Sequence, residues 1–122
     1  MKIVEAPHPS SGHYCAGVIS NGMLYISGQT SADPFTGKVT PDGIGAEMMV
    51  CLNRMDHILQ AAGLDRNHVI MCRVYVSDMN MWQQANEAYQ YFFGEHRPAR
   101  AVIESPHIHH GAHLELEAIA EV

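Results

Sequence analysis

The chain has 122 residues, 47% of them hydrophobic and 16% charged, so it has the size of one domain and is too apolar to be intrinsically disordered. The formal net charge of −6 comes with seven scattered lysines and arginines, which argues against a nucleic-acid-binding surface, because such surfaces carry clustered basic side chains. No apolar run approaches the roughly 20 residues needed to cross a bilayer, and no signal peptide is evident, so we expect a single cytoplasmic domain over residues 1–122.

The first strong signal along the chain is a β-hairpin. Two apolar runs flank Asn21 and Gly22, and both of these residues tolerate the positive φ of a tight hairpin turn. We therefore predict strands at 16–20 and 23–27. The Gly-, Pro- and Asp-rich segment 30–43 then indicates a loop.

Two amphipathic segments follow, with a strand between them. Apolar side chains recur at steps of three and four over residues 44–62, which predicts a helix that ends at Gly63. Residues 78–96 predict a second helix by the same criterion. The intervening β-rich segment 68–78 is too short for a good helix. Its expected core face consists of Ile70, Cys72, Val74 and Val76.

The chain ends with two more predicted strands, at 99–104 and 112–121. The resulting order, ββαβαββ, favours an α+β fold with a single mixed sheet and two helices on one face. Such a sheet leaves its other face free for subunit packing, with a site between chains. On that face we place Arg73, Tyr75, Arg100, Glu115 and Glu117.

Arg100 opens a predicted strand with a charge that cannot be removed near neutral pH. It is either a solvated edge charge or a guanidinium fork for a carboxylate or phosphate. Glu115 and Glu117 are two residues apart on one strand and point the same way. Either they form a solvated strand face, or one neutralises an arginine while the other becomes a general acid/base through a raised pKa.

The histidines and cysteines offer weaker signals. The histidines at 107, 109, 110 and 113 follow no known ligand spacing, so we favour a surface loop or pocket wall over a metal site. Cys15, Cys51 and Cys72 lack CxxC spacing and are typical of free thiols in a reducing compartment. Cys51 and Cys72 fall on predicted core faces, whereas Cys15 has more chance of exposure.

Several stretches together resemble the Rid (YjgF-like) family of reactive intermediate deaminases. They are "GHYCAGV", "LYISGQTSADPFTG", "LNRMDHILQAAG", "VYVSDM", "NEAYQYFFGEHRPARA" and "LELEAIA". The resemblance implies a chorismate-mutase-like fold and a homotrimer with sites between subunits. It also implies hydrolysis of 2-aminoacrylate or 2-iminobutyrate, released by pyridoxal-phosphate enzymes, to 2-oxo acids and ammonia, without a metal or organic cofactor.

The resemblance also implies roles for individual residues. Arg100 would hold the substrate carboxylate, and Glu115 would activate the attacking water and pass a proton to nitrogen. Gly28 would let the backbone approach the ligand closely. The remaining pocket positions would be Tyr14, Ser27, Asn86 and Val102.

Three departures from the family pattern bear on substrate range. Val102 replaces the Cys, Ser or Thr that many active members carry, and a Gln-Thr pair is absent near Glu47 and Met48. The loop "SPHIHHGA" replaces a short Leu-Pro-x-Gly type. An alternative function is therefore non-catalytic binding or sensing of small carboxylates through the same arginine. RNA cleavage, attributed to some relatives, is disfavoured by the net charge of −6.

Overall fold

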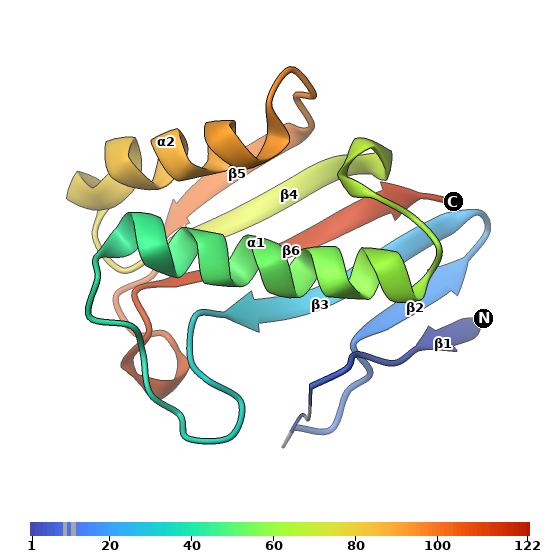
Figure 1. Cartoon of the computed structure of the whole chain (residues 1–122), viewed down its shortest axis with the longest axis horizontal. Coiled ribbons are helices and arrows are strands. Elements are labelled where there is room, and N and C mark those ends of the chain that lie inside the picture. Colours follow the sequence, from blue (N-terminus) through green and yellow to red (C-terminus); the bar gives the residue numbers. More distant parts are fainter. Residues whose placement is uncertain (9, 11) are drawn as a thin grey trace.

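The computed structural model describes residues 1–8, 10 and 12–122, and it contains a six-stranded mixed sheet with both α-helices on one face (Figure 1). We call the covered side of the sheet the helix face and the other side the open face. The strands lie in the order β1-β2-β3-β6-β4-β5, with β4 and β5 parallel and the other pairs antiparallel. The elements are β1 (Lys2–Val4), β2 (Gly17–Ser20), β3 (Met23–Thr30), α1 (Ile44–Ala61), β4 (Val69–Val76), α2 (Trp82–Phe93), β5 (Ala99–Glu104) and β6 (Leu114–Glu121).

This architecture confirms the predicted α+β fold, but the predicted order ββαβαββ lacks one strand. Lys2–Val4 forms the edge strand β1 and pairs antiparallel with β2, so that Val4 lies opposite Gly17. A three-residue strand is too short to show an alternating pattern, and its existence depends on the neighbouring edge. The prediction therefore missed β1, whereas the seven predicted elements all form, with differences at some of their ends.

The predicted hairpin forms at Asn21 and Gly22, whose φ angles are 52° and 74°. Strand β3 runs on to Thr30, beyond the predicted end at residue 27. Its pairing with β6 shifts register between Ile26 and Gln29. Such a bulge bends a strand and re-aims its side chains. Here it changes the backbone at two of the predicted pocket residues.

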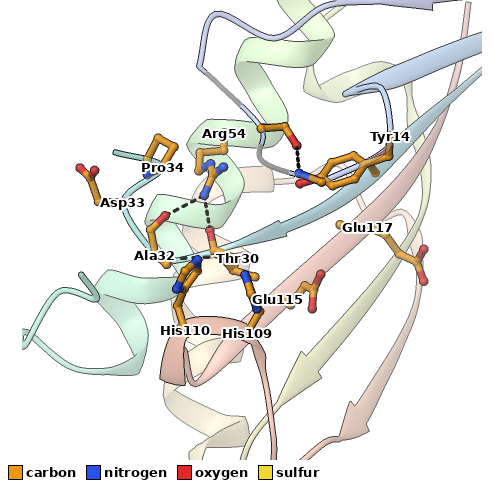
Figure 2. A pocket seen from close by; sticks show the side chains of 14 residues that line it. Tyr14, Thr30, Ala32, Asp33, Pro34, Arg54, His109, His110, Glu115 and Glu117 are labelled. Carbon is orange, nitrogen blue, oxygen red and sulfur yellow. Dashed lines mark hydrogen bonds between the residues drawn. The ribbon is translucent and has the colours of Figure 1, made fainter. Parts of the chain in front are cut away.

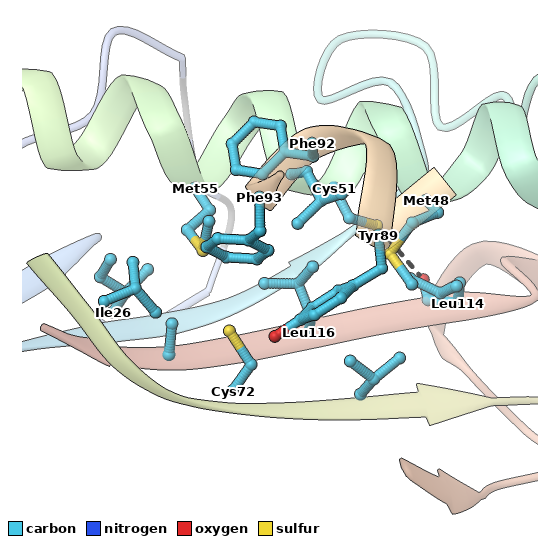
Figure 3. Packing of buried hydrophobic residues seen from close by; sticks show 14 of the residues in the cluster. Ile26, Met48, Cys51, Met55, Cys72, Tyr89, Phe92, Phe93, Leu114 and Leu116 are labelled. Carbon is cyan, nitrogen blue, oxygen red and sulfur yellow. Dashed lines mark hydrogen bonds between the residues drawn. The ribbon is translucent and has the colours of Figure 1, made fainter. Parts of the chain in front are cut away.

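The core lies between the helices and the helix face of the sheet (Figure 3). The predicted stripe of α1 is buried, and so are the aromatic residues of α2 that pack beside it. Each large apolar side chain buried in this way contributes about 1.5–3 kcal/mol relative to exposure. The fully buried members include Leu24, Met48, Leu52, Met55, Ile58, Leu59, Leu114 and Leu116. Across the described chain, neither α1 nor α2 combines the length and hydrophobicity of a membrane-crossing helix.

One predicted core residue of β4 was assigned to the wrong face. Ile70 is 40% exposed, whereas its neighbour Val69 is fully buried. The pairing of β4 with β6 shifts register between Val69 and Met71, and this irregularity breaks the period-two alternation at the start of the strand. Cys72, Val74 and Val76 are buried as predicted.

Candidate functional site

A polar cleft of about 540 Å³ opens beside the N-terminal start of β6 (Figure 2). It brings together Tyr14, Ser27, Gly28 and Glu115, four of the residues singled out in the sequence. We call it the glutamate cleft. The other lining residues with polar or charged side chains include Thr30, Asp33, Arg54, His109, His110 and Glu117.

Glu115 is seated against the backbone of β3 at Gly28. A Cβ atom added to Gly28 would overlap Oε1 of Glu115, so any larger residue at position 28 would displace the carboxylate. The sequence suggested that Gly28 allows close approach of a ligand. In the structure, the group that approaches the glycine is the side chain of Glu115 itself.

The two glutamates of β6 lie in different environments. Glu117 accepts a hydrogen bond of 2.6 Å from the Tyr75 hydroxyl, and one of its oxygens lies 3.6 Å from Nη1 of Arg73. Glu115 has no such partner among the described residues. Partial burial raises the pKa of Glu115, the charge of Glu117 raises it further, and His109 opposes both effects. Glu115 is thus the carboxyl group better suited to exchange a proton.

Ser27 and Tyr14 form another wall of the glutamate cleft. The Ser27 hydroxyl donates a 2.7 Å hydrogen bond to the carbonyl of Cys15, which ties the bulge of β3 to the segment that carries Tyr14. The Tyr14 side chain is 56% exposed and lines the cleft. In this arrangement Ser27 positions the tyrosine-bearing segment.

Arg100 does not lie on the open face, contrary to the sequence prediction. The parallel pairing of β4 and β5 places it opposite Cys72, which is fully buried under the helices. Its Nη1 donates a 2.9 Å hydrogen bond to Oδ1 of Asn86, and its Cζ lies 4.7 Å from the centre of the Tyr89 ring. The guanidinium also lies 5.6 Å from the Trp82 ring. Arg100 is therefore held against α2.

The predicted site residues thus fall into two groups within one chain. Arg100 and Asn86 line a separate hollow beside α2, which we call the arginine hollow. Val102 lies on the same helix face, opposite Val74, and packs against the core. Glu115 lies on the open face, because it alternates along β6 with Leu114 and Leu116, which are buried on the helix face. The arginine and the glutamate are consequently on opposite faces of the sheet.

The sequence prediction missed Arg54, which forms part of the cleft wall. Its Nη1 donates hydrogen bonds to the backbone carbonyls of Thr30 (2.8 Å) and Ala32 (2.9 Å). Desolvation lowers the pKa of its half-buried guanidinium. The sequence did contain a sign that Arg54 is partly buried. It follows Cys51 by three residues and precedes Met55, so it lies at the edge of the buried stripe of α1.

A buried carboxylate, Glu47, was also missed as a structural element. It is 3% exposed and accepts hydrogen bonds from the Ser31 hydroxyl (2.7 Å), the His113 amide (2.9 Å) and Nδ1 of His113 (2.8 Å). Glu47 follows Ile44 by three residues, so the sequence places its charge on the apolar stripe of α1. This position is the sign from which its burial could have been predicted. Glu47 fixes the end of the histidine-rich loop to the first turn of α1.

The four histidines are directed to different places. His113 contacts Glu47, the rings of His109 and His110 lie tilted against each other at the cleft with centroids 3.9 Å apart, and His107 is exposed. Within residues 1–8, 10 and 12–122, no three His, Cys, Asp or Glu side chains are grouped so that they could hold a metal ion.

The cysteines are free thiols, as predicted. Cys51 and Cys72 are buried in the core, and burial raises the pKa of both, to about 11 for Cys72. Cys15 is only partly buried. Because thiolates are the reactive form, neither core cysteine is suited to nucleophilic catalysis.

Comparison with known proteins gives consistent matches over nearly the whole chain. A family profile described as Endoribonuclease L-PSP matches residues 4–122. The 2-iminobutanoate/2-iminopropanoate deaminase of Mus musculus is 38% identical over 109 residues, covering 89% of this chain and 81% of that protein. The crystal structure of the E. coli YjgF gene product superposes with a TM-score of 0.90 at 32% identity, covering 99% of this chain and 98% of that one. E. coli TdcF with bound serine gives a TM-score of 0.90 at 33% identity, covering 100% and 99%.

Proposed function

The chain belongs to the endoribonuclease L-PSP family, which includes the YjgF-like (Rid) proteins, and from this premise we propose that it hydrolyses 2-imino and 2-enamino acids. The substrates are of the 2-aminoacrylate or 2-iminobutyrate type, and the products are the 2-oxo acid and ammonia. The observation that carries the proposal is the carboxyl group of Glu115, with its raised pKa, held against Gly28 in a polar cleft.

The chemistry needs one proton-exchanging group and no strong nucleophile, because an imine carbon is already electrophilic. Glu115 as a carboxylate accepts a proton from water as the water oxygen bonds to C2 of the imine. The nitrogen takes up protons, in part from the protonated Glu115, and leaves as ammonia while the C2 carbonyl forms. One imine and one water thus give one 2-oxo acid and one ammonia. Fixing the substrate beside one oriented water supplies much of the rate enhancement.

In this proposal the substrate carboxylate is held by Arg100 of a neighbouring subunit. Within one chain Arg100 and Glu115 are on opposite faces of the sheet, so one substrate can contact both groups only between two copies. The open face favours such packing, because Tyr25 and Ile103 on it are 49% and 39% exposed in the single chain. A homotrimer with its sites in the clefts between subunits meets this requirement, as the family resemblance implies.

The names of the relatives support the same substrate class. The mouse relative is named for 2-iminobutanoate and 2-iminopropanoate, and TdcF binds serine, a small acid with an α-carboxylate and an α-nitrogen. Pyridoxal-phosphate enzymes that release such imines are the functional partners implied. The family name also points to RNA, but the net charge of −6 disfavours a phosphate-binding surface.

The proposal is tested by adding the purified protein to an amino-acid oxidase or threonine dehydratase reaction and following the disappearance of the imine. We expect faster release of the 2-oxo acid. We expect Arg100→Ala to lower kcat/KM by about 30- to 160-fold, since a charge-assisted carboxylate contact contributes about 2–3 kcal/mol. Lys2→Ala is the control, because Lys2 is an exposed cation on β1 that lines neither the glutamate cleft nor the arginine hollow.

Calorimetry with 2-oxobutyrate separates catalysis from the alternative function of carboxylate sensing. Binding that depends on Arg100 without any acceleration of imine hydrolysis would establish the sensor and exclude the hydrolase. Acceleration that is unchanged in Arg100→Ala would remove the proposed role of the arginine hollow.

A further inference from the structure

The loop that carries the histidines, residues 105–113, is fixed to the body of the protein and lies at the glutamate cleft (Figure 2). Its end is held by the two hydrogen bonds from His113 to the buried carboxylate of Glu47. Its middle is a short 3-10 turn at His109–Gly111. The family resemblance leads one to expect a shorter loop without imidazoles here, so this chain adds polar side chains at the entrance of the site.

His110 adopts a backbone conformation that most side chains avoid. Its φ is 60° and its ψ is 18°, which is the left-handed region. Such a conformation persists only where the surroundings favour it. Here the ring packs on Gly37, where an added Cβ would lie 3.3 Å from Nδ1 of His110, and it lies tilted against the ring of His109. The loop thus places two exposed imidazoles side by side at the cleft.

Arg54 adds a permanent charge to the same wall. Among the described residues, no carboxylate lies within ion-pair distance of Arg54, although its guanidinium is half-buried. Its two hydrogen bonds to the carbonyls of Thr30 and Ala32 orient it, and the carboxylate of Asp33, which also lines the cleft, attracts its charge without reaching ion-pair distance. A partly desolvated cation whose hydrogen-bond acceptors are neutral carbonyls gains from a directly bound anion.

We propose that this basic wall, formed by Arg54, His109 and His110, binds a second carboxylate on the substrate, so that among 2-imino acids the site prefers those with a distal carboxylate. The inference rests on the proposed imine hydrolysis and specifies its substrate class. Arg100 of the neighbouring subunit holds the α-carboxylate, the basic wall holds the side-chain carboxylate, and Glu115 beside His109 faces the imine carbon between them.

The test compares two imines that differ only at the end of the side chain. Amino-acid oxidases release one from glutamate and the other from norvaline, which has a methyl group in place of the distal carboxylate. We expect wild-type kcat/KM to be about tenfold or more higher for the glutamate-derived imine, because donors placed for an anion discriminate against an apolar analogue. His109→Leu should lower this ratio about tenfold, whereas His109→Gln, which keeps a donor, should preserve most of it.

His107→Leu is the matched control, since His107 is an exposed histidine of the same loop that does not line the cleft. An unchanged ratio in this variant, together with loss of the ratio in His109→Leu, supports the basic wall. Equal rates for the two imines, or faster hydrolysis of the norvaline-derived one, overturn the inference and leave the proposed function intact.

Absence of any imine hydrolysis would instead overturn the proposed function, and the basic wall would then be judged by binding alone. Calorimetry with 2-oxoglutarate and 2-oxopentanoate makes the same comparison on stable ligands. Tighter binding of 2-oxoglutarate that disappears in His109→Leu supports a distal carboxylate site. Equal binding of the two acids refutes it.

Discussion

Arg100 and Glu115 lie on opposite faces of one sheet, and this geometry gives a quantitative prediction for mixed assemblies. Arg100→Ala removes the arginine half of a site and Glu115→Gln removes the glutamate half, so each variant alone should lose nearly all imine hydrolysis. If every site combines a glutamate cleft from one subunit with an arginine hollow from the next, however, the two variants complement each other when they assemble together.

The size of the recovery follows from counting the intact halves. In an equimolar mixture, half of the glutamate clefts and half of the arginine hollows are intact, and each site draws its two halves from different subunits. A site is therefore complete with a probability of about one quarter in a symmetric ring, and the mixture should show about a quarter of the wild-type rate.

The two variants are co-expressed with different affinity tags, purified through both tags in succession, and assayed for the rate of 2-oxo acid release. Purification through both tags removes the homo-oligomers, which contain no complete site. A purified mixed trimer then has one complete site in three and should show about a third of the wild-type rate at the same concentration of subunits. Co-assembly of Glu115→Gln with the Arg100→Ala/Glu115→Gln double variant is the control and should remain inactive, because no glutamate half is intact.

Mixed oligomers that are present by native mass spectrometry but show no recovered activity would refute a site shared between subunits. A single species of one-chain mass in the wild-type protein would refute it independently. In either case the Arg100 contact to substrate would have to be abandoned, because within one chain the guanidinium is held against α2.

Three further predictions concern single positions. Gly28→Ala should lower kcat/KM by about 100-fold with little change in the urea midpoint of unfolding. The added methyl group displaces the Glu115 carboxylate, and misplacement of a reacting group by about 1 Å has effects of this size. Wild-type kinetics in this variant would disprove the contact between Glu115 and Gly28. The pKa of Glu115 is raised in the folded chain, so its ionisation lowers the free energy of unfolding above that pKa and has no effect below the ordinary pKa of a glutamate. Glu117→Gln removes a negative charge that raises the pKa of Glu115, so it should move the acidic limb of the pH profile of kcat/KM to lower pH. An acidic limb that does not move would show that a group other than Glu115 causes it. Glu47→Ala should lower the free energy of unfolding by about 2–3 kcal/mol, because it leaves the buried Ser31 hydroxyl and the His113 amide without their acceptor. Glu87→Ala on the exposed side of α2 should change it by less than about 0.5 kcal/mol, and equal urea midpoints for the two variants would contradict this reasoning.

Most of the fold was predictable because its elements carry strong local signals. The stripe of α1 repeats over 18 residues, and β6 alternates without interruption from Leu114 to Glu121. The hairpin at Asn21 and Gly22 is encoded by residues that accept positive φ. What could not be predicted depends on neighbours distant in sequence. Strand β1 exists because β2 offers it an edge, and Ile70 is exposed because β4 shifts register against β6.

Four of the predicted site residues lie together in the glutamate cleft, and the sequence predicted the geometry of the candidate site only in part. Period two fixed the common face of Glu115 and Glu117, since the intervening residues are apolar. Strand β5 gave no such guide, because "ARAVIE" is apolar on both faces and its register depends on a parallel partner. Arg100 was therefore assigned to the wrong face. The roles of Arg54 and Glu47 emerged only when α1 was packed against the loops.

The position of Val102 now bears on a different question from the one that its sequence raised. Val102 and Arg100 share the helix face of β5, and Val102 packs on the core opposite Val74, away from Glu115. A hydroxyl or thiol at this position would accordingly belong to the arginine half of a shared site. In the proposed site, valine at this position would change how the α-carboxylate is held and would leave Glu115 and its surroundings as they are. We therefore expect Val102 to narrow the substrate range without abolishing turnover, which agrees with the proposed recognition of a second carboxylate.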